Sequence, residues 1–500
     1  MSSGSVMRRK SVEQSIKDTE EPEHQLKKNL GALDLVVFGV GVIIGAGIFV
    51  ITGQVAKTNA GPAIALSFLI AAFACGLAAL CYAEFASTVP VAGSAYTFSY
   101  ATFGELIAWI IGWDLVLEFT IGSAALASGF SGYLNTLLDG TAFALPASLR
   151  SASGDGVLDL PAIVISLLVM LILIGGIKFS SVFNQVVVAI KLAVVALVII
   201  AGVGYVSVSN WTPFVPPSQP SDGTGGGFLD TPLIQTILGI EPATYGLAGV
   251  ISAAALVFFA FIGFDVVATT AEEVKNPQRD VPIGILGSLA IVTVLYMAVS
   301  LIITGMQDYR EIDAEDGAPL ATAFDAVGLT WMGNIIAIGA CIGLTVVVMI
   351  LMLGQTRVAF AMARDGLLPR GLARTHPTYG TPYRITLITG VAVAAISGFV
   401  PLGELAKLVN IGTLFAFTLV SIGVVILRRT HPDLPRAFRV PAVTLVATLA
   451  TVLCVYLMLN LEGETWVRFL IWMAIGIVVY FAYGRSHSRL GQREREQASQ

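Results

Sequence analysis

Apolar runs long enough to cross a lipid bilayer follow one another along almost the whole chain. A helix needs about 20 predominantly apolar residues to span the hydrocarbon core, because each residue advances it by only about 1.5 Å. Only 12% of the residues are charged, whereas a soluble domain carries about 25%. The sequence therefore predicts an all-α integral membrane protein with twelve spanning helices, at residues 33–55, 62–88, 104–133, 160–177, 182–207, 246–272, 282–306, 333–362, 385–400, 404–427, 440–460 and 466–483.

Lysine and arginine residues are distributed unevenly between the two sides that these spans define. With the N-terminus inside, 23 of the 28 lie on the inner side or nearest to it, and the exceptions are Lys57, Arg150, Arg310, Lys407 and Arg468. Cytoplasmic loops of membrane proteins carry an excess of these residues. We therefore expect a multi-pass protein of the cell (cytoplasmic) membrane with both termini in the cytoplasm.

A glycine-rich sequence, GVGVIIGAGIF at residues 39–49, interrupts the first apolar run. Two glycines within residues 45–47 let the backbone leave helical geometry at little steric cost. The freed N–H groups, together with the dipole of the half-helix that follows, favour a bound carboxylate. The alternative interpretation is that these glycines only allow helices to pack closely.

A second interruption, FFAFIGFD at residues 258–265, lies 216 residues later when Gly263 is aligned with Gly47. Unwound backbone is tolerated inside a bilayer only where it lines a cavity or is buried in protein. Broken helices at matching places in two halves of a chain therefore indicate the binding site of a transporter. Carbonyl groups near Phe259 and Ile262 lose their helical partners and can accept hydrogen bonds from an ammonium group.

Ionisable residues at membrane depth are the second indication of function. Asp114 and Glu118 are four residues apart and share one helical face. Such groups are costly in lipid and usually face a cavity or a partner. Glu118 and Asp265 are candidates for a proton relay or for selectivity, and structural pairing is the alternative. Lys191 is the best candidate for proton coupling or for a fixed charge in place of a sodium ion, unless it snorkels to the interface.

The cysteines and histidines do not form a constellation suited to catalysis. All four cysteines lie inside apolar runs at no metal-ligand spacing, and the four histidines lie in tails or loops. An enzyme would need such groups at ligand or triad spacing. We therefore do not expect an enzyme, a bound metal, a cofactor or a nucleic-acid partner.

Four motifs give the chain a family likeness over about residues 33–483. They are GVGVIIGAGIF (39–49), YAEFASTVPVAGSAYTFSYATFGE (82–105), FFAFIGFDVVATTAEEVKNPQRDVP (258–282) and GQTRVAFAMARDGLLP (354–369). With them the chain resembles the amino acid–polyamine–organocation superfamily, and most of all its cationic amino acid transporter branch. The resemblance implies a five-plus-five inverted repeat of the leucine transporter type, with discontinuous helices 1 and 6 and two additional C-terminal helices.

The resemblance divides the chain into six parts. These are a cytoplasmic tail (1–30), the first inverted repeat with helices 1–5 (31–207), an extracellular loop (208–245), the second repeat with helices 6–10 (246–427), helices 11 and 12 (428–484) and a cytoplasmic tail (485–500).

The resemblance also implies a substrate site made largely of backbone groups. N–H groups around Ala46 and Gly47 would hold the α-carboxylate of a free amino acid. The carbonyl groups of Ile43, Phe259 and Ile262 would hold its α-amino group.

Side chains complete this implied site. Phe261 and Phe264 would form gate or pocket walls. Gly45 and Ala260, in the same two breaks, are further candidate substrate-binding residues. Lys191 matches a lysine that stands, in proton-coupled relatives, where sodium-coupled ones bind the ion.

The sequence thus predicts a secondary active transporter that imports L-amino acids by alternating access and proton symport, with broad or cationic specificity. The alternative is an amino acid exchanger without proton coupling. The proton gradient would be the energy source, and the lipid bilayer would surround the protein. We expect a monomer, unless a small membrane partner subunit binds the last two helices.

Overall fold

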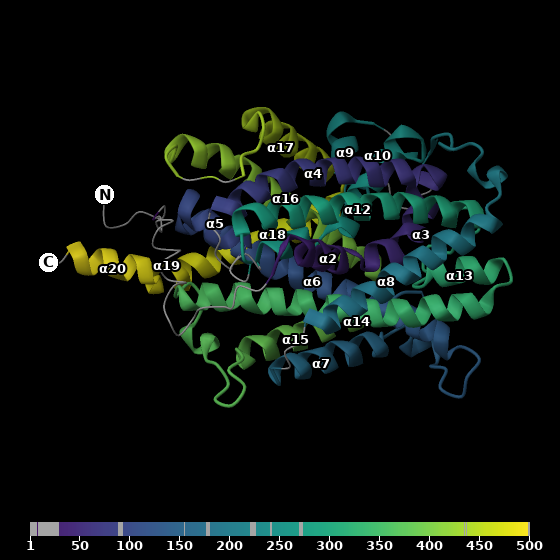
Figure 1. Ribbon diagram of the computed structural model, residues 1–500, viewed down its shortest axis with the longest axis horizontal. Helices are drawn as coiled ribbons and strands as arrows, with labels where there is room; N and C mark the ends of the chain where they lie inside the picture. The colour runs from purple at the N-terminus through teal and green to yellow at the C-terminus, as the bar shows by residue number, and fades with distance from the viewer. Residues whose placement is uncertain are drawn as a thin grey trace.

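The computed structural model describes residue 8 and residues 30–88, 94–154, 156–176, 181–220, 227–240, 243–269, 274–434, 436 and 438–498. Most of the predicted N-terminal tail, and part of the 82–105 motif, lie outside these residues. The described chain is a bundle of helices in which the longest ones run along the long axis of the molecule (Figure 1).

The helices follow the apolar runs closely. Their bounds are α2 (Ala32–Ile43), α3 (Thr52–Val55), α4 (Ile64–Thr88), α5 (Ser94–Thr102), α6 (Glu105–Leu138), α7 (Leu160–Ile174), α8 (Ser181–Gly202), α9 (Leu233–Leu238), α10 (Gly246–Val257), α11 (Phe264–Thr269), α12 (Pro277–Met306), α13 (Pro319–Ala326), α14 (Thr330–Arg364), α15 (Tyr383–Phe399), α16 (Leu402–Thr430), α17 (Val443–Leu459), α18 (Gly463–Val479), α19 (Arg485–His487) and α20 (Arg489–Ala498).

Eight helical segments of the described chain are long and apolar enough to cross a membrane. Four shorter apolar helices, α2, α7, α15 and α17, accompany them. The predicted helical membrane architecture is therefore confirmed at this level, whereas the count of twelve spans and the inverted repeat remain predictions. At the centre of the bundle α6 packs on α14, and α12 packs on both α2 and α4.

One end of the bundle holds Arg8 together with the C-terminal helices, and we call it the terminal face (Figure 1). The carboxylate of Glu105, at the start of α6, accepts hydrogen bonds from Tyr100 and Tyr480, both at 2.9 Å, and from Ser488. The guanidinium of Arg8 lies 3.6 Å from the same carboxylate. The other end, which we call the opposite face, carries the segment between α8 and α10. There, strands β1 (Gln219–Pro220) and β2 (Ala243–Thr244) pair antiparallel, with Gln219 opposite Thr244.

A short backbone bridge at the terminal face joins two segments that are distant in sequence. Leu30, just before α2, pairs with Val274, which precedes α12, in a parallel arrangement. The N–H of Lys275 donates to the carbonyl of Leu30 at 2.9 Å. The entrance to α2 is thereby attached to the segment that leads from α11 to α12.

Glu84, buried near the end of α4, holds three segments together at the terminal face. Its two carboxylate oxygens accept hydrogen bonds from Arg428 of α16, at 2.7 and 2.5 Å, and one of them also accepts the N–H of Val440 at 2.7 Å. Removing one member of such a buried charged pair leaves the other without a partner.

We therefore expect Glu84→Gln to lower the free energy of unfolding by about 2 kcal/mol, since hydrogen bonds to charged groups contribute about 1.5–3 kcal/mol each. Thermal unfolding of the purified protein in detergent measures the effect as a lower Tm. Glu311→Gln is the control, because this side chain is exposed and forms no ion pair with a described residue. Equal Tm values for the two variants would contradict the expectation.

Candidate functional site

The first helix breaks at the predicted glycines. The last hydrogen bond of α2 joins the N–H of Ile44 to the carbonyl of Val40 at 3.0 Å, and helical bonding resumes with the N–H of Phe49 on the carbonyl of Gly45 at 3.3 Å. A π-helical turn, Gly47–Ile51, leads from there into α3. The N–H groups between the two bonds stand at the start of the second half-helix, where the first N–H groups have no intrahelical acceptor. This is where the sequence predicts a carboxylate.

The second break is a change of backbone direction between α10 and α11. A 3₁₀ turn, Phe258–Phe261, follows α10, and the backbone is then extended at Ile262, with φ −63° and ψ 138°. Gly263 has a φ of +118°, a backbone conformation that residues other than glycine rarely adopt. A Cβ at Gly263 would also lie 2.7 Å from a methyl carbon of Val42, so glycine is required here on two grounds.

The two breaks lie directly against each other. A Cβ added to Gly47 would be 2.1 Å from the Cα of Ala260 and 2.3 Å from its Cβ. The close-packing interpretation of Gly47 therefore describes this structure. The carboxylate role of Ala46 and Gly47 remains a prediction, and it is compatible with packing because both need backbone that is free of a side chain.

Lys191 of α8 caps the first half of the broken helix. Its side chain is fully buried, and its Nζ donates to the carbonyl oxygens of Gly41 at 2.6 Å and Ile44 at 3.0 Å. The last carbonyl groups of a helix have no intrahelical donor, and the helix dipole favours a cation there. Gly343 of α14 makes room for this lysine, since a Cβ on it would come within 2.9 Å of the lysine Cε. Snorkelling of Lys191 to an interface is thus excluded.

Two buried tyrosines also hold the first break, and the sequence analysis missed both. The hydroxyl of Tyr296 donates to the carbonyl of Ile43 at 2.7 Å, and that of Tyr133 donates to the carbonyl of Phe49 at 2.5 Å. A carbonyl has two lone pairs, so Ile43 keeps one for the predicted α-amino group. The available signal was a tyrosine inside an apolar run, because a buried phenol hydroxyl usually finds an acceptor.

Aromatic rings surround the second break. Phe261 contacts Tyr296 with ring centres 5.4 Å apart. Phe264 contacts Tyr82 at 5.9 Å and Phe417 at 4.9 Å. The predicted wall residues thus each belong to an aromatic cluster, Phe261 with rings from α4 and α12 and Phe264 with rings from α4 and α16.

The predicted carboxylates form a buried acidic group beside the breaks. Asp114, Glu118 and Asp265 are each at most 1% exposed. Their carboxylate oxygens form no well-aligned hydrogen bond with the described residues, although Thr413 lies near the carboxylate of Glu118 and backbone N–H groups at the start of α11 lie near that of Asp265. Asp114 and Asp265 both lie close enough to Glu118 to interact with it electrostatically. A carboxylate in such surroundings costs free energy unless it binds a proton or a cation, so this group can take up either.

A cavity leads toward the breaks from the opposite face. Its volume is about 280 Å³, and polar groups such as Gln54, Ser252 and Lys407 line it. It reaches Ile51, at the end of the π-helical turn after the first break, and Leu256, just before the second. The cavity thus comes within a few residues of each break along the chain, although no described residue of either break lines it, while the Glu84 and Glu105 networks join several segments at the terminal face.

This geometry agrees with comparisons to known proteins. A family profile described as "Amino acid permease" matches residues 30–481. The chain is 47% identical over 494 residues to the branched-chain amino acid permease BcaP of Bacillus subtilis, covering 98% of this chain and 100% of that protein. It is 46% identical over 491 residues to the methylthioribose transporter of the same organism, with 98% and 100% coverage. It is 39% identical over 433 residues to the vacuolar cationic amino acid transporter 4 of Arabidopsis thaliana, covering 86% of this chain and 68% of that one.

The chain belongs to the amino acid permease family. The predicted resemblance to an amino acid–polyamine–organocation transporter is confirmed, and so is the multi-pass membrane character. The relatives are named as transporters and permeases.

Bulk at Gly47 should force the two breaks apart. We expect Gly47→Val to lower the free energy of unfolding by about 1–3 kcal/mol, the usual cost of overpacking, because the new side chain meets the backbone of Ala260. The control is Gly76→Val in α4, where a Cβ has its nearest neighbour, a Leu289 carbon, at 3.9 Å. Tm measurements on both variants check this, and an unchanged Tm for Gly47→Val would show that the breaks separate freely.

Proposed function

We propose that this protein is a secondary active transporter that imports L-amino acids across the cytoplasmic membrane by alternating access, with the proton gradient as its energy source. The observation that carries the proposal is the meeting of two broken helices at Gly47 and Ala260, near a polar cavity whose lining includes Ile51 and Leu256. The first break offers N–H groups. At the second, the carbonyl of Phe259 accepts the N–H of Ile262 at 3.3 Å and keeps one lone pair for a further donor. Such a pair of opposite dipolar ends suits the carboxylate and ammonium of an amino acid.

The orientation in the membrane follows from charge. The terminal face carries most of the lysine and arginine residues, so we place it, with both termini, in the cytoplasm. The opposite face, with the 280 Å³ cavity, is then extracellular. Substrate would enter through this cavity and leave past the Glu84 and Glu105 networks, once these separate.

Two features of the site bear on which amino acid is carried. The aromatic clusters around Phe261 and around Phe264 suit apolar side chains, in line with the relative named a branched-chain amino acid permease. The carboxylates of Glu118 and Asp265 suit cationic side chains, in line with the relatives named cationic amino acid transporters. We infer a broad specificity for zwitterionic and cationic amino acids.

A second candidate substrate comes from the relative named a methylthioribose transporter. A sugar derivative of this kind lacks both the carboxylate and the ammonium of an amino acid. The N–H and carbonyl groups of the two breaks would then have no carboxylate and no ammonium to bind. Uptake of methylthioribose would therefore indicate that the site binds its substrate through other contacts.

Proton coupling is proposed for Lys191. Its ammonium holds the carbonyl groups at the end of α2, and a neutral amine would hold them less strongly because charge-assisted hydrogen bonds are the stronger ones. Loss of the proton would thus loosen the first break. Glu118 and Asp265, buried without hydrogen-bond partners among the described residues, are the proposed further proton-binding or selectivity groups. An exchanger without proton coupling is the alternative.

Uptake into proteoliposomes tests the function. Labelled leucine, arginine and methylthioribose are each offered with and without an inward pH gradient in sodium-free buffer. We expect both amino acids to accumulate only with the gradient. Uptake that requires amino acid preloaded inside would identify an exchanger, and uptake of methylthioribose alone would reject amino acids as substrates.

Lys191→Ala isolates the coupling step. We expect this variant to lose accumulation driven by the pH gradient while it still binds substrate, because the site groups of both breaks are retained. Arg374→Ala, which removes an exposed cation of the terminal face, serves as the control and should transport normally. Uphill transport by Lys191→Ala at the wild-type level would remove this lysine from the coupling mechanism.

A further inference from the structure

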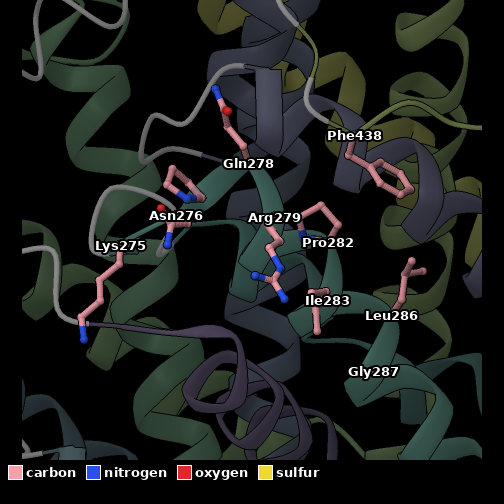
Figure 2. A pocket seen from close by; sticks show the side chains of 10 residues that line it. Lys275, Asn276, Gln278, Arg279, Pro282, Ile283, Leu286, Gly287 and Phe438 are labelled. Atoms are coloured by element: carbon pink, nitrogen blue, oxygen red, sulfur yellow. The ribbon is translucent and has the colours of Figure 1, made fainter.

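A groove of about 1020 Å³ opens at the terminal face beside the first turns of α12. It shares no lining residue with the cavity that leads to the breaks. Figure 2 shows Lys275 and Asn276 at one end of the groove and Leu286 and Phe438 at the other, with Arg279 between them. Phe438 belongs to the segment between α16 and α17, so the groove is formed by two parts of the chain.

The polar end of the groove carries two cations among the residues that the structure describes. These are Lys275 and Arg279, the only titratable residues in the described part of the lining, and both side chains are exposed. Neither side chain forms an ion pair or hydrogen bond with any residue that the structure describes. The acidic neighbour, Asp280, is 7% exposed and does not line the groove. An arginine fork and a lysine ammonium with free donors suit a phosphate group.

The other end of the groove is apolar and continues into the membrane span. Ile283 is 42% exposed, and the same face of α12 carries Ile291 at 44% and Val294 at 67%. These positions recur at the spacing of one helical face. In a bilayer the acyl chains of lipids cover such a stripe, so a lipid whose headgroup lies at the polar end of the groove would have a chain beside it.

We propose that this groove binds an anionic phospholipid, with the headgroup phosphate on Lys275 and Arg279 and an acyl chain along Ile283 and the exposed face of α12. Basic pockets at the cytoplasmic ends of transmembrane helices are suited to such headgroups. The assignment to the cytoplasmic leaflet rests on the orientation proposed above. The backbone of Lys275 is bonded to Leu30, so the bound lipid would contact the segment that joins both broken helices at this face.

Native mass spectrometry of the full, delipidated protein in detergent tests the site directly and needs no transport activity. Dioleoyl phosphatidylglycerol is the probe, and dioleoyl phosphatidylcholine is the uncharged comparison. We expect one tightly bound phosphatidylglycerol and weaker binding of phosphatidylcholine. Lys275→Gln with Arg279→Gln should lower the affinity for phosphatidylglycerol about 30-fold, as expected for the loss of two basic residues near a lipid surface.

Matched variants separate this site from a general effect of charge. Arg364→Gln with Arg374→Gln removes two exposed cations of the same face outside the groove and should leave the affinity unchanged. Ile283→Ser should weaken binding of the dioleoyl lipid while both cations remain.

Equal losses in the two double variants, or equal binding of both lipids, would overturn the proposal. Glycerol phosphate that competes as well as the lipid does would identify a phosphate site instead. Binding without any amino acid uptake would leave this site intact and reject only the transport proposal.

Discussion

The structure depends on one constraint, which is that backbone N–H and carbonyl groups inside a membrane need partners. A broken helix violates this constraint unless other groups supply the missing hydrogen bonds. Here the ammonium of Lys191 donates hydrogen bonds to the carbonyl groups of Gly41 and Ile44, and the hydroxyl of Tyr296 donates one to the carbonyl of Ile43. The first break is therefore stabilised from α8 and α12, two helices that come much later in the chain.

The same constraint explains why the second break lies where it does. Gly263 turns the backbone with a φ of +118°, and Gly47 approaches Ala260 so closely that no side chain fits between them. Each break thus buries the other, and neither exposes its backbone to lipid. The carboxylates of Asp114, Glu118 and Asp265 are buried, and no hydrogen bond to them is formed within the described residues, whereas the carboxylates of Glu84 and Glu105 each accept several hydrogen bonds.

The sequence was informative wherever a signal was local. The apolar run predicted at 385–400 and the observed α15, Tyr383–Phe399, differ by two residues at most. Both breaks were predicted because glycine marks them directly. The partners of the breaks could not be predicted, because Lys191 and Gly41 are 150 residues apart and only the fold brings them together. Tyr296 looked like one more aromatic residue in an apolar run, and its role became visible only through its contact with Ile43. The roles predicted for Ile43, Ala46 and Gly47 toward a substrate concern a bound state and remain predictions.

The pairing of Leu30 with Val274 has a mechanical consequence. It fastens the inner half of the first broken helix to the strand of chain that follows the inner half of the second. Under the alternating access proposed above, α2 cannot move away from the start of α12 at this face without breaking that backbone link. The proposal therefore couples the movement of the first broken helix to the movement of α12.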